Sequence, residues 1–464
     1  MRKEEYLWLN RIWKQLDRFG FKNYEIKKDM VLFFLCLVLV DKKNDKTSAK
    51  RDEPKNYNSF NWAEIASLSK SDLHKVFYEK NLNGRNLSDF NSEQIQKYCS
   101  VQLWNFRQFP DLEPSQLFRL VKRVNEINLN IQSSFSTALH FLQEKKLNRH
   151  SGQCFTPLHI AHVIGVISQE FNAQSVLDPS CGIGDLLSSL QRYQGKIRSL
   201  EGWEIDPFLA DCASFNLWLT GNQTFKISNK DTLDNNSDKK QFDLILANPP
   251  FGNGNPAIIK NAIAKTKTSR IELVFLDRIM TLLKDSGLAI VVLPLGFLHS
   301  TSKAHLSIRK RLVEEFHIEG IVEFPKGVFL PATVIRTVLL VFTRHKKKLD
   351  YKTIWHYKLQ SDGFSADKIR KPIPENDLPD LLNSWKSRNS KNEKSKSVNF
   401  LRVTDIQQNN YVLIPNSEKK EEINIPPSSQ KTVEELFDEL KSIEEKRRLK
   451  LLSLEKLMNE RYTG

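Results

Sequence analysis

Apolar residues in the first third of the chain recur at helical spacing. Leu117, Leu120 and Val124 lie three or four positions apart, which places them on one face of a helix. The run Met30–Val40 is wholly apolar. Because it is shorter than the roughly 20 residues that a bilayer requires, we expect a buried helix and no membrane span. The pattern predicts an N-terminal helical domain over residues 1–150.

The pattern changes between about residue 151 and residue 345. Short apolar runs ending in Asp, Asn or Pro alternate there with longer amphipathic stretches. The runs include Ser175–Asp178, Phe242–Ala247, Leu288–Leu293 and Val338–Phe342. This alternation predicts an α/β fold, a Rossmann-like and mostly parallel sheet with helices on both faces. Ligands of such sheets bind at the carboxyl ends of the strands.

The last part of the chain contains two different sequence patterns. Residues 376–430 are less regular and include a Lys-, Ser- and Asn-rich stretch, which predicts a loop or linker region. Over residues 431–464, Val433, Phe437 and Leu440 recur at helical spacing, which predicts an amphipathic C-terminal helix. This helix would pack on a partner subunit or cover the core of its own chain, and the sequence favours neither.

Charge and cysteine content limit the kinds of partner and of bound metal that the protein is expected to have. The 464 residues carry a formal net charge of +15, which favours a polyanionic partner or serves only solubility. The five cysteines lie apart, without a CxxC pair. That spacing indicates neither a disulfide framework nor a zinc site. We therefore expect a cytoplasmic protein of two or three domains, with no bound metal and no membrane segment.

A turn with two glycines follows the first apolar run. Asp178 ends the run, and Gly182 and Gly184 precede a predicted helix. The glycines let the backbone approach a bound nucleoside, and Asp178 can accept hydrogen bonds from a cationic ligand group. The patterns GxGxxG and GxxxxGK[ST] are absent, which disfavours dinucleotides and nucleoside triphosphates. Alone, the turn could equally be a structural corner between strand and helix.

Two further acids follow at the spacing of a nucleotide-binding sheet. Glu204 ends the next apolar run, where a carboxylate commonly takes both ribose hydroxyls. The alternative is an acid that caps the following helix, a role that suits Asp206 better. Asp231 lies after the third run, and we expect it to meet the adenine ring of the same ligand.

The segment Phe242–Gly252 carries the most specific chemistry, because an apolar strand runs directly into Asn248-Pro249-Pro250-Phe251. The Asn248 side chain offers an amide oxygen, and the proline pair can direct the carbonyl of Pro249 toward the same point. Two acceptors then hold the hydrogens of one amine and aim its lone pair at a methyl donor, while Phe251 stacks on the base. Geometry and electrostatics supply most of the catalysis, without a strong general base.

A stiff turn without chemistry is the alternative for Asn-Pro-Pro. Its position directly after a strand, downstream of Asp178 and Glu204, favours the catalytic interpretation. A base in duplex DNA would have to be flipped out of the stack to reach such a pocket, at a cost of a few kcal/mol.

With these segments the chain resembles the modification (methyltransferase) subunit of type I restriction-modification systems, a gamma-type N6-adenine DNA methyltransferase. The resemblance covers most of residues 110–375. It rests on these segments: Gly152–Pro157, Asp178–Gly184, Asn248–Gly252, Leu293–Gly296, Phe324–Phe329 and Tyr357–Pro374. The glycine turn departs from the usual form of the family at Ile183 and Asp185.

The resemblance implies a methyltransferase domain over residues 151–375 that uses S-adenosylmethionine as its cofactor. The implied cofactor contacts are Phe155, Thr156, Pro157, Asp178, Gly182, Gly184, Glu204 and Asp231. The implied contacts to the target adenine are Asn248, Pro249, Pro250 and Phe251.

The resemblance also implies partners. They are double-stranded DNA, a DNA-specificity subunit that reads the sequence, a second copy of this chain and a restriction or translocase subunit. Two alternatives stay open. One is a methyltransferase of another DNA-defence system, or one acting on RNA or a protein amide. The other is a catalytically silent DNA-binding assembly subunit, against which the intact Asn248, Pro249 and Phe251 argue.

Overall fold

The protein is described by a computed structural model. It describes residues 3–48, 62–78, 112–126, 129–131, 133–145, 155–190, 197–221, 224–234, 240–254, 268–330, 332–344, 351–367, 370–388, 395–415 and 445. The chain divides into two units, Met1–Ile414 and Pro415–Gly464. The C-terminal helix predicted over residues 431–464 lies, apart from Glu445, outside the described residues.

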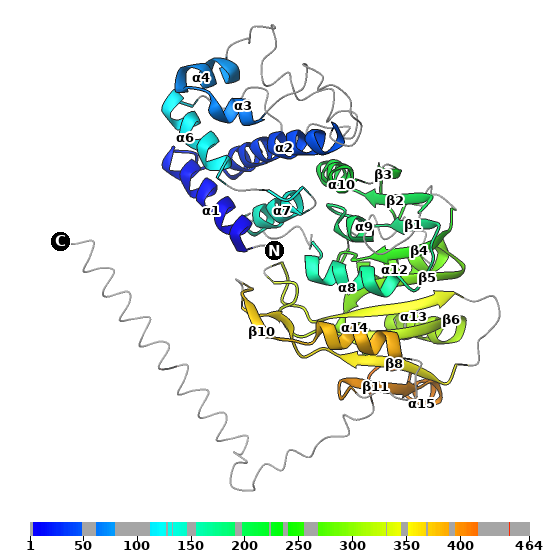
Figure 1. The fold of residues 1–464 in the computed structure, drawn as a ribbon. Coiled ribbons are helices and arrows are strands. Elements are labelled where there is room, and N and C mark those ends of the chain that lie inside the picture. Colours follow the sequence, from blue (N-terminus) through cyan, green and yellow to red (C-terminus); the bar gives the residue numbers. More distant parts are fainter. Residues whose placement is uncertain are drawn as a thin grey trace. The chain divides into compact units, whose positions relative to one another are not determined.

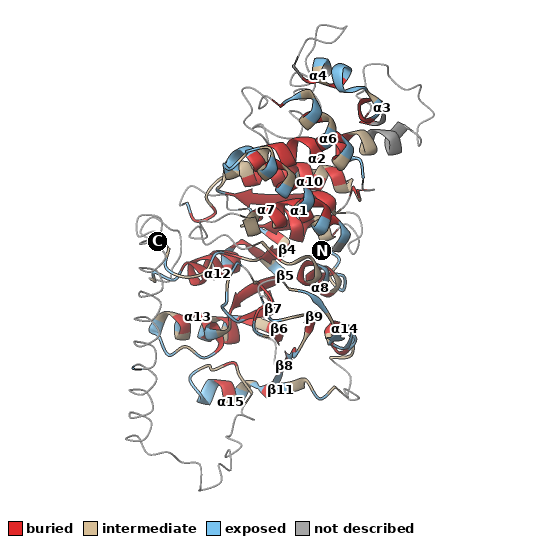
Figure 2. Ribbon diagram, turned by 90° about the vertical axis from the view of Figure 1, so that its left-hand side faces the viewer, coloured by how far each residue is buried: buried red, intermediate tan, exposed pale blue. Residues whose placement is uncertain are grey.

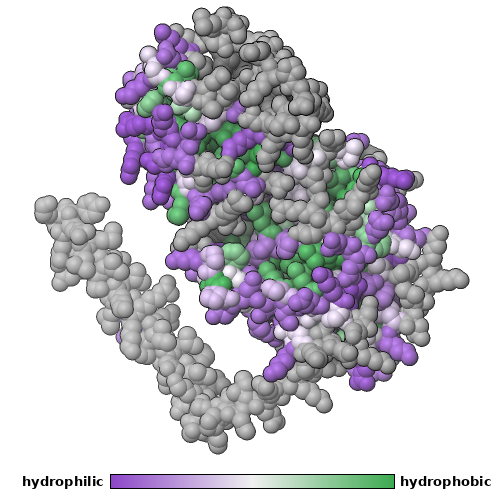
Figure 3. Space-filling model, in the orientation of Figure 1, coloured by the Kyte–Doolittle hydropathy of each residue, from purple (hydrophilic) through white to green (hydrophobic). Residues whose placement is uncertain are grey.

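The N-terminal part of the first unit is helical, as predicted. Its helices are α1 (Lys3–Arg18), α2 (Tyr24–Ser48), α3 (Trp62–Ser67), α4 (Lys70–Tyr78), α6 (Pro114–Val124) and α7 (Ser134–Lys145) (Figure 1). Helix α6 buries Leu117, Leu120 and Val124 on one face, which confirms the helical period. On the face that Figure 3 shows, the described residues at the periphery of this helical region are mostly hydrophilic.

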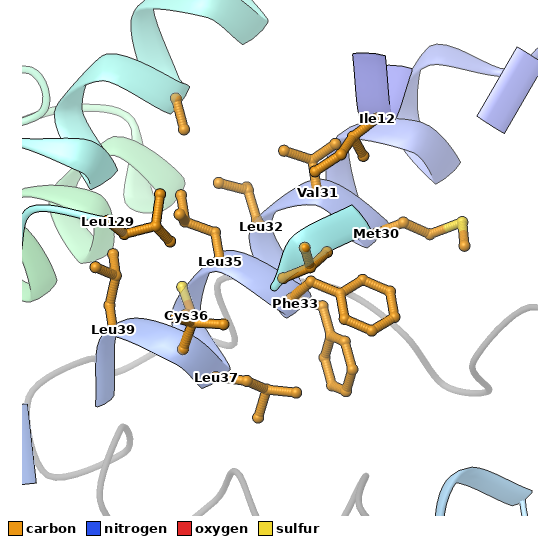
Figure 4. Close-up of a cluster of buried hydrophobic side chains, with 14 of the residues drawn as sticks. Ile12, Met30, Val31, Leu32, Phe33, Leu35, Cys36, Leu37, Leu39 and Leu129 are labelled. Atoms are coloured by element: carbon orange, nitrogen blue, oxygen red, sulfur yellow. The ribbon is translucent and has the colours of Figure 1, made fainter. Parts of the chain in front are cut away.

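The apolar run Met30–Val40 forms the middle of α2, and all its residues are buried. Helix α1 and the segment before α7 cover it from different sides, since Val31 meets Ile12 of α1 while Leu35 and Leu39 lie toward Leu129 (Figure 4). The prediction of a buried helix is confirmed. Among the described residues, no helix has the length and apolar character needed to cross a bilayer.

A nine-stranded sheet forms the second part of this unit, in the order β11-β8-β6-β7-β5-β4-β1-β2-β3. Strands β3, β2, β1, β4 and β5 run parallel to one another, whereas β7 is antiparallel to both β5 and β6. The strands are β1 (Ser175–Asp178), β2 (Ser199–Glu204), β3 (Phe225–Asn229), β4 (Phe242–Ala247), β5 (Leu283–Pro294), β6 (Phe316–Glu323), β7 (Thr337–Arg344), β8 (Thr353–Lys358) and β11 (Val398–Arg402). A separate hairpin pairs β9 (Asp362–Phe364) with β10 (Pro372–Asn376).

Helices cover both faces of the sheet, so its central strands are buried (Figure 2). The helices are α8 (Leu158–Ser168), α9 (Asp185–Leu190), α10 (Pro207–Thr220), α12 (Ile271–Leu282), the 3-10 helix η2 (Leu295–Leu298), α13 (Lys303–Glu315), α14 (Leu378–Ser387) and α15 (Val403–Gln408). Successive residues point to opposite faces. Thus Val176 and Leu244 pack with α8, α9 and α14, while Leu177 and Ile245 pack with α12 and α13. The predicted α/β fold with helices on both faces is confirmed.

The sheet extends beyond residue 375. Helix α14 covers one face, and β11 pairs antiparallel with β8 at the edge before α15 begins. The prediction of a loop or linker over residues 376–430 is therefore wrong for Leu378–Ser387 and for residues 398–408. An edge strand buries little, and Leu401 is the one buried residue of β11, so the sequence shows no apolar alternation there.

The burial of α2 yields a stability prediction. Leu35 is 1% exposed, whereas Ile26 on the same helix is 37% exposed. We expect Leu35→Ala to lower the free energy of unfolding by about 2–5 kcal/mol, because it leaves a cavity. The control Ile26→Ala should cost less than about 1 kcal/mol. Denaturant unfolding followed by circular dichroism measures both, and equal losses would show that α2 is not packed as described.

Candidate active site

The carboxyl ends of three neighbouring parallel strands form the candidate site. Strand β1 lies between β2 and β4 in the sheet. It ends at Asp178, β2 ends at Glu204, and β4 leads into Asn248. Since the strands are parallel, these three side chains meet at one edge of the sheet. Residues far apart in the sequence are thereby brought together where ligands of such sheets bind.

The glycine turn after β1 is held against the end of β2. The backbone N–H of Gly182 donates a hydrogen bond to Oε2 of Glu204 at 2.9 Å, and the N–H of Asp206 donates to Oε1 at 3.0 Å. Gly182 and Gly184 have φ values of 53° and 79°, which side chains rarely adopt. A Cβ at Gly184 would lie 3.2 Å from the side chain of Ala213. Both the backbone conformation and the close packing of α10 therefore require glycine at this position.

The carboxyl groups of Asp178 and Glu204 are both buried, so water solvates them only partly. Burial, together with the nearby charge of Glu204, raises the pKa of Asp178 from 3.8 to about 8, although the N–H of Ser180 donates to Oδ1 at 3.0 Å and lowers it. Burial also raises the pKa of Glu204, against the stabilising backbone donors of Asp206 and Gly182. Two acids that are costly to ionise together fit a ligand that brings positive charge.

Asp206 and Asp231 have local roles. Asp206 caps α10, because its Oδ1 accepts from the N–H of Leu209 at 3.1 Å; the capping alternative thus holds for Asp206 and not for Glu204. Asp231 accepts from the N–H of Leu233 at 2.9 Å. The hydroxyl of the adjacent Thr232 donates to the carbonyl of Pro179. That bond holds the Asp231 turn beside the turn after β1.

Ile205 is a further candidate site residue, which sequence reasoning missed. Its side chain is 58% exposed, although it directly follows Glu204 at the carboxyl end of β2. An exposed large apolar residue at the ligand-binding edge offers a surface for a flat ring. The sequence feature that could have indicated it is its position between the two acids Glu204 and Asp206.

Asn248 is oriented by a residue from a distant segment. Its Nδ2 donates to Oγ1 of Thr156 at 3.1 Å, and Thr156 is only 6% exposed. Since Nδ2 donates to Thr156, the amide group is oriented with its oxygen on the side away from Thr156. The predicted cofactor segment Phe155–Pro157 and the Asn-Pro-Pro turn are thereby joined directly.

The remainder of the turn is supported from α12. Pro249 is buried, Pro250 is exposed, and Phe251 is half-buried against the core. The N–H of Gly252 donates to Oε2 of Glu272 at 2.9 Å, and Glu272 is 1% exposed. Glu272 was also missed by sequence reasoning; an acid inside the apolar stretch Ile271–Ile279 was the available signal. It fixes the exit of the turn, so Phe251 sits on a rigid frame.

Comparison with known proteins identifies the type of site. The family model described as N-6 DNA Methylase matches residues 139–424, which is more than half of the chain. The match includes β1, β2 and β4 and all the site residues described above.

Among named relatives, the Type I restriction enzyme EcoEI methylase subunit of Escherichia coli is 28% identical over 295 residues, covering 58% of each chain. The Type I restriction enzyme MpnII methylase subunit of Mycoplasma pneumoniae is 24% identical over 358 residues, covering 70% of this chain and 64% of the relative. The chain thus spans about three fifths of these relatives. The solved type I restriction-modification system methyltransferase subunit from Streptococcus thermophilus shares the fold, with a TM-score of 0.58 at 19% identity, covering 89% of this chain and 98% of that one.

The raised pKa of Asp178 predicts a pH dependence of stability. The folded protein holds a proton on Asp178 between its unfolded pKa of 3.8 and its folded pKa of about 8. Because the folded state binds more protons in this window, stability falls as the pH rises through it. Asp178→Asn removes that contribution. We expect the stabilities of variant and wild type to diverge by up to about 1.4 kcal/mol per pH unit between pH 5 and 8.

Denaturant unfolding at several pH values measures this divergence. Asp206→Asn is the matched control, since asparagine also caps helices well, and its curve should run parallel to that of the wild type. If the Asp178→Asn curve is parallel too, Asp178 is not protonated in the folded protein.

Proposed function

Because the chain belongs to the N-6 DNA Methylase family, we propose that it transfers a methyl group from S-adenosylmethionine to the N6 amine of a flipped-out adenine in double-stranded DNA. The observation that carries the proposal is the hydrogen bond from Nδ2 of Asn248 to Thr156. It orients the amide so that its oxygen is the acceptor offered to an incoming amine. The same bond links the target-base turn to the segment that leads into the cofactor edge.

The residues at the carboxyl ends of β1 and β2 fit this cofactor. S-adenosylmethionine supplies a methyl group on a sulfonium and carries a cationic amine. The buried Asp178 accepts from cationic and polar groups, and Glu204 accepts from the ribose hydroxyls. The glycine turn lets the backbone approach the nucleoside, while Ile205, 58% exposed, and the turn at Asp231 line the side where the adenine ring lies. Phe155, Thr156 and Pro157 close the site from the segment before α8.

The target amine is held by acceptors and needs no strong base. Oδ1 of Asn248 and the carbonyl of Pro249 accept the two hydrogens of the exocyclic amine, which aims the nitrogen lone pair at the methyl carbon. Pro250 stiffens the turn, and Phe251 stacks on the flipped adenine. Prepositioned acceptors of this kind stabilise the positive charge that develops on the amine during transfer.

The charge of the chain supports DNA as the substrate. The formal net charge of +15 favours a polyanion, and base flipping is required because a stacked adenine cannot enter the site. We further propose that the chain is the modification subunit of a type I-like complex in the cytoplasm. Two relatives are named as type I methylase subunits. The proposed partners are a specificity subunit, a second copy of this chain and a restriction or translocase subunit.

Asn248→Ala tests the catalytic role of the amide. We expect cofactor binding, measured by calorimetry, to be retained and the rate of adenine methylation to fall about 100-fold or more, the typical effect of losing one prepositioned polar contact. Asn383→Ala, at an exposed position of α14, is the matched control and should methylate normally. Undiminished methylation by Asn248→Ala would refute the mechanism, and methylation of RNA in place of DNA would refute the substrate.

Phe251→Ala tests base stacking. Loss of the ring should weaken binding of a duplex with a mispaired adenine by about 1 to 3 kcal/mol. Phe251→Trp should restore most of the affinity, since indole also stacks. Fluorescence anisotropy measures both, and equal affinity of wild type and Phe251→Ala would remove this role from Phe251.

A further inference from the structure

The two residues at which the glycine turn departs from the usual form of the family both point toward the helical region. Asp185 begins α9 and is 4% exposed. The hydroxyl of Ser136 donates to its Oδ1 at 2.6 Å, and Nε2 of His140 lies 2.8 Å from its Oδ2. Both partners belong to α7. The carboxylate directly after the glycine turn is thus held by helix α7 of the N-terminal region.

A third partner connects Asp185 to the turn itself. Nδ2 of Asn216, on α10, lies 3.4 Å from Oδ1 of Asp185 and donates to the carbonyl of Ile183 at 3.0 Å. That carbonyl stands between the two glycines with positive φ. The orientation of the turn and the position of the Asp185 carboxylate are therefore set by one buried network.

Ile183 connects the same turn to the helical region by apolar packing. It is 2% exposed and packs in the hydrophobic cluster that is built mainly from the helical region. Phe135 of α7 and Phe215 of α10, both in that cluster, meet edge-to-face at 4.8 Å. A smaller residue in place of Ile183 would leave part of this junction unfilled.

A second contact near the turn also leads back to α7. The ring of Phe155 lies 5.4 Å from that of His140, edge-to-face. Its Cδ1 is 3.9 Å from the position that a Cβ on Gly182 would take. Helix α7 thus contacts the turn region through Asp185 and, by way of His140, through Phe155.

We infer that Asp185 is a positioning residue through which helix α7 holds the cofactor-binding turn, so that cofactor affinity and the docking of the helical region are energetically coupled. This inference rests on the proposed function. Coupling of this kind is reciprocal. Loosening α7 lowers affinity for the cofactor, and binding of the cofactor stabilises α7 in its docked position.

Variants on both sides of the contact between α7 and Asp185 test the coupling without altering the proposed cofactor contacts. In the full chain, Ser136→Ala, His140→Phe and Asp185→Ala should each raise the Kd for S-adenosylmethionine about 5-fold or more, as measured by calorimetry. Asp185→Asn retains an acceptor for Ser136 and should recover much of the affinity. Thr137→Val is the matched control: Thr137 is buried on α7, and its hydroxyl has no hydrogen-bond partner among the described residues. Its Kd should equal that of the wild type.

Hydrogen exchange separates positioning from a purely structural role. S-adenosylmethionine should slow amide exchange across residues 134–145 in the wild type, and this protection should be lost in Ser136→Ala and Asp185→Ala. Variants that lower the thermal midpoint but keep the wild-type Kd and protection would overturn the inference and leave the proposed function intact. A wild type that does not bind S-adenosylmethionine would overturn both.

Discussion

The hydrogen bond from the N–H of Gly182 to Glu204 is the contact on which the site depends. It fixes the turn after β1 onto the end of β2, and the turn follows this path only because Gly182 and Gly184 accept positive φ. From the turn, the chain enters α9 with Asp185 directed at α7. One backbone donor thus determines where the cofactor edge lies and where the helical region attaches.

The second half of the site is built by contacts between distant segments. The bond between Asn248 and Thr156 joins the turn after β4 to the segment before α8. Glu272 on α12 receives the N–H of Gly252 on the far side of the turn. These two contacts hold the turn after β4 at both ends, so the Asn248 side chain loses little conformational freedom when a substrate binds. Preorganised acceptors of this kind act on the transition state without a reorganisation cost.

The site contains buried acidic side chains, and burying an acid costs folding free energy. Asp178 has a pKa raised to about 8 by burial, so its ionised form is disfavoured until a cationic ligand is present. Asp185 is equally buried, but Ser136, His140 and Asn216 surround it. Local departures from apolar packing are expected where function requires them. Here the buried acids lie at two places: Asp178 at the carboxyl end of β1, and Asp185 where α9 contacts α7.

The order of residues along the chain was enough to predict the class of fold and the strand ends that carry polar groups, because period-two and helical patterns reflect which faces are buried. It thereby identified Asp178, Glu204 and Asn248 as candidate site residues. The edge strand β11, the support from Glu272, the accepting role of Thr156 toward Asn248 and the partners of Asp185 emerged only from the tertiary structure. Each depends on which distant segments become neighbours. A local pattern records burial, but it carries no information about the residue on the other side of a contact.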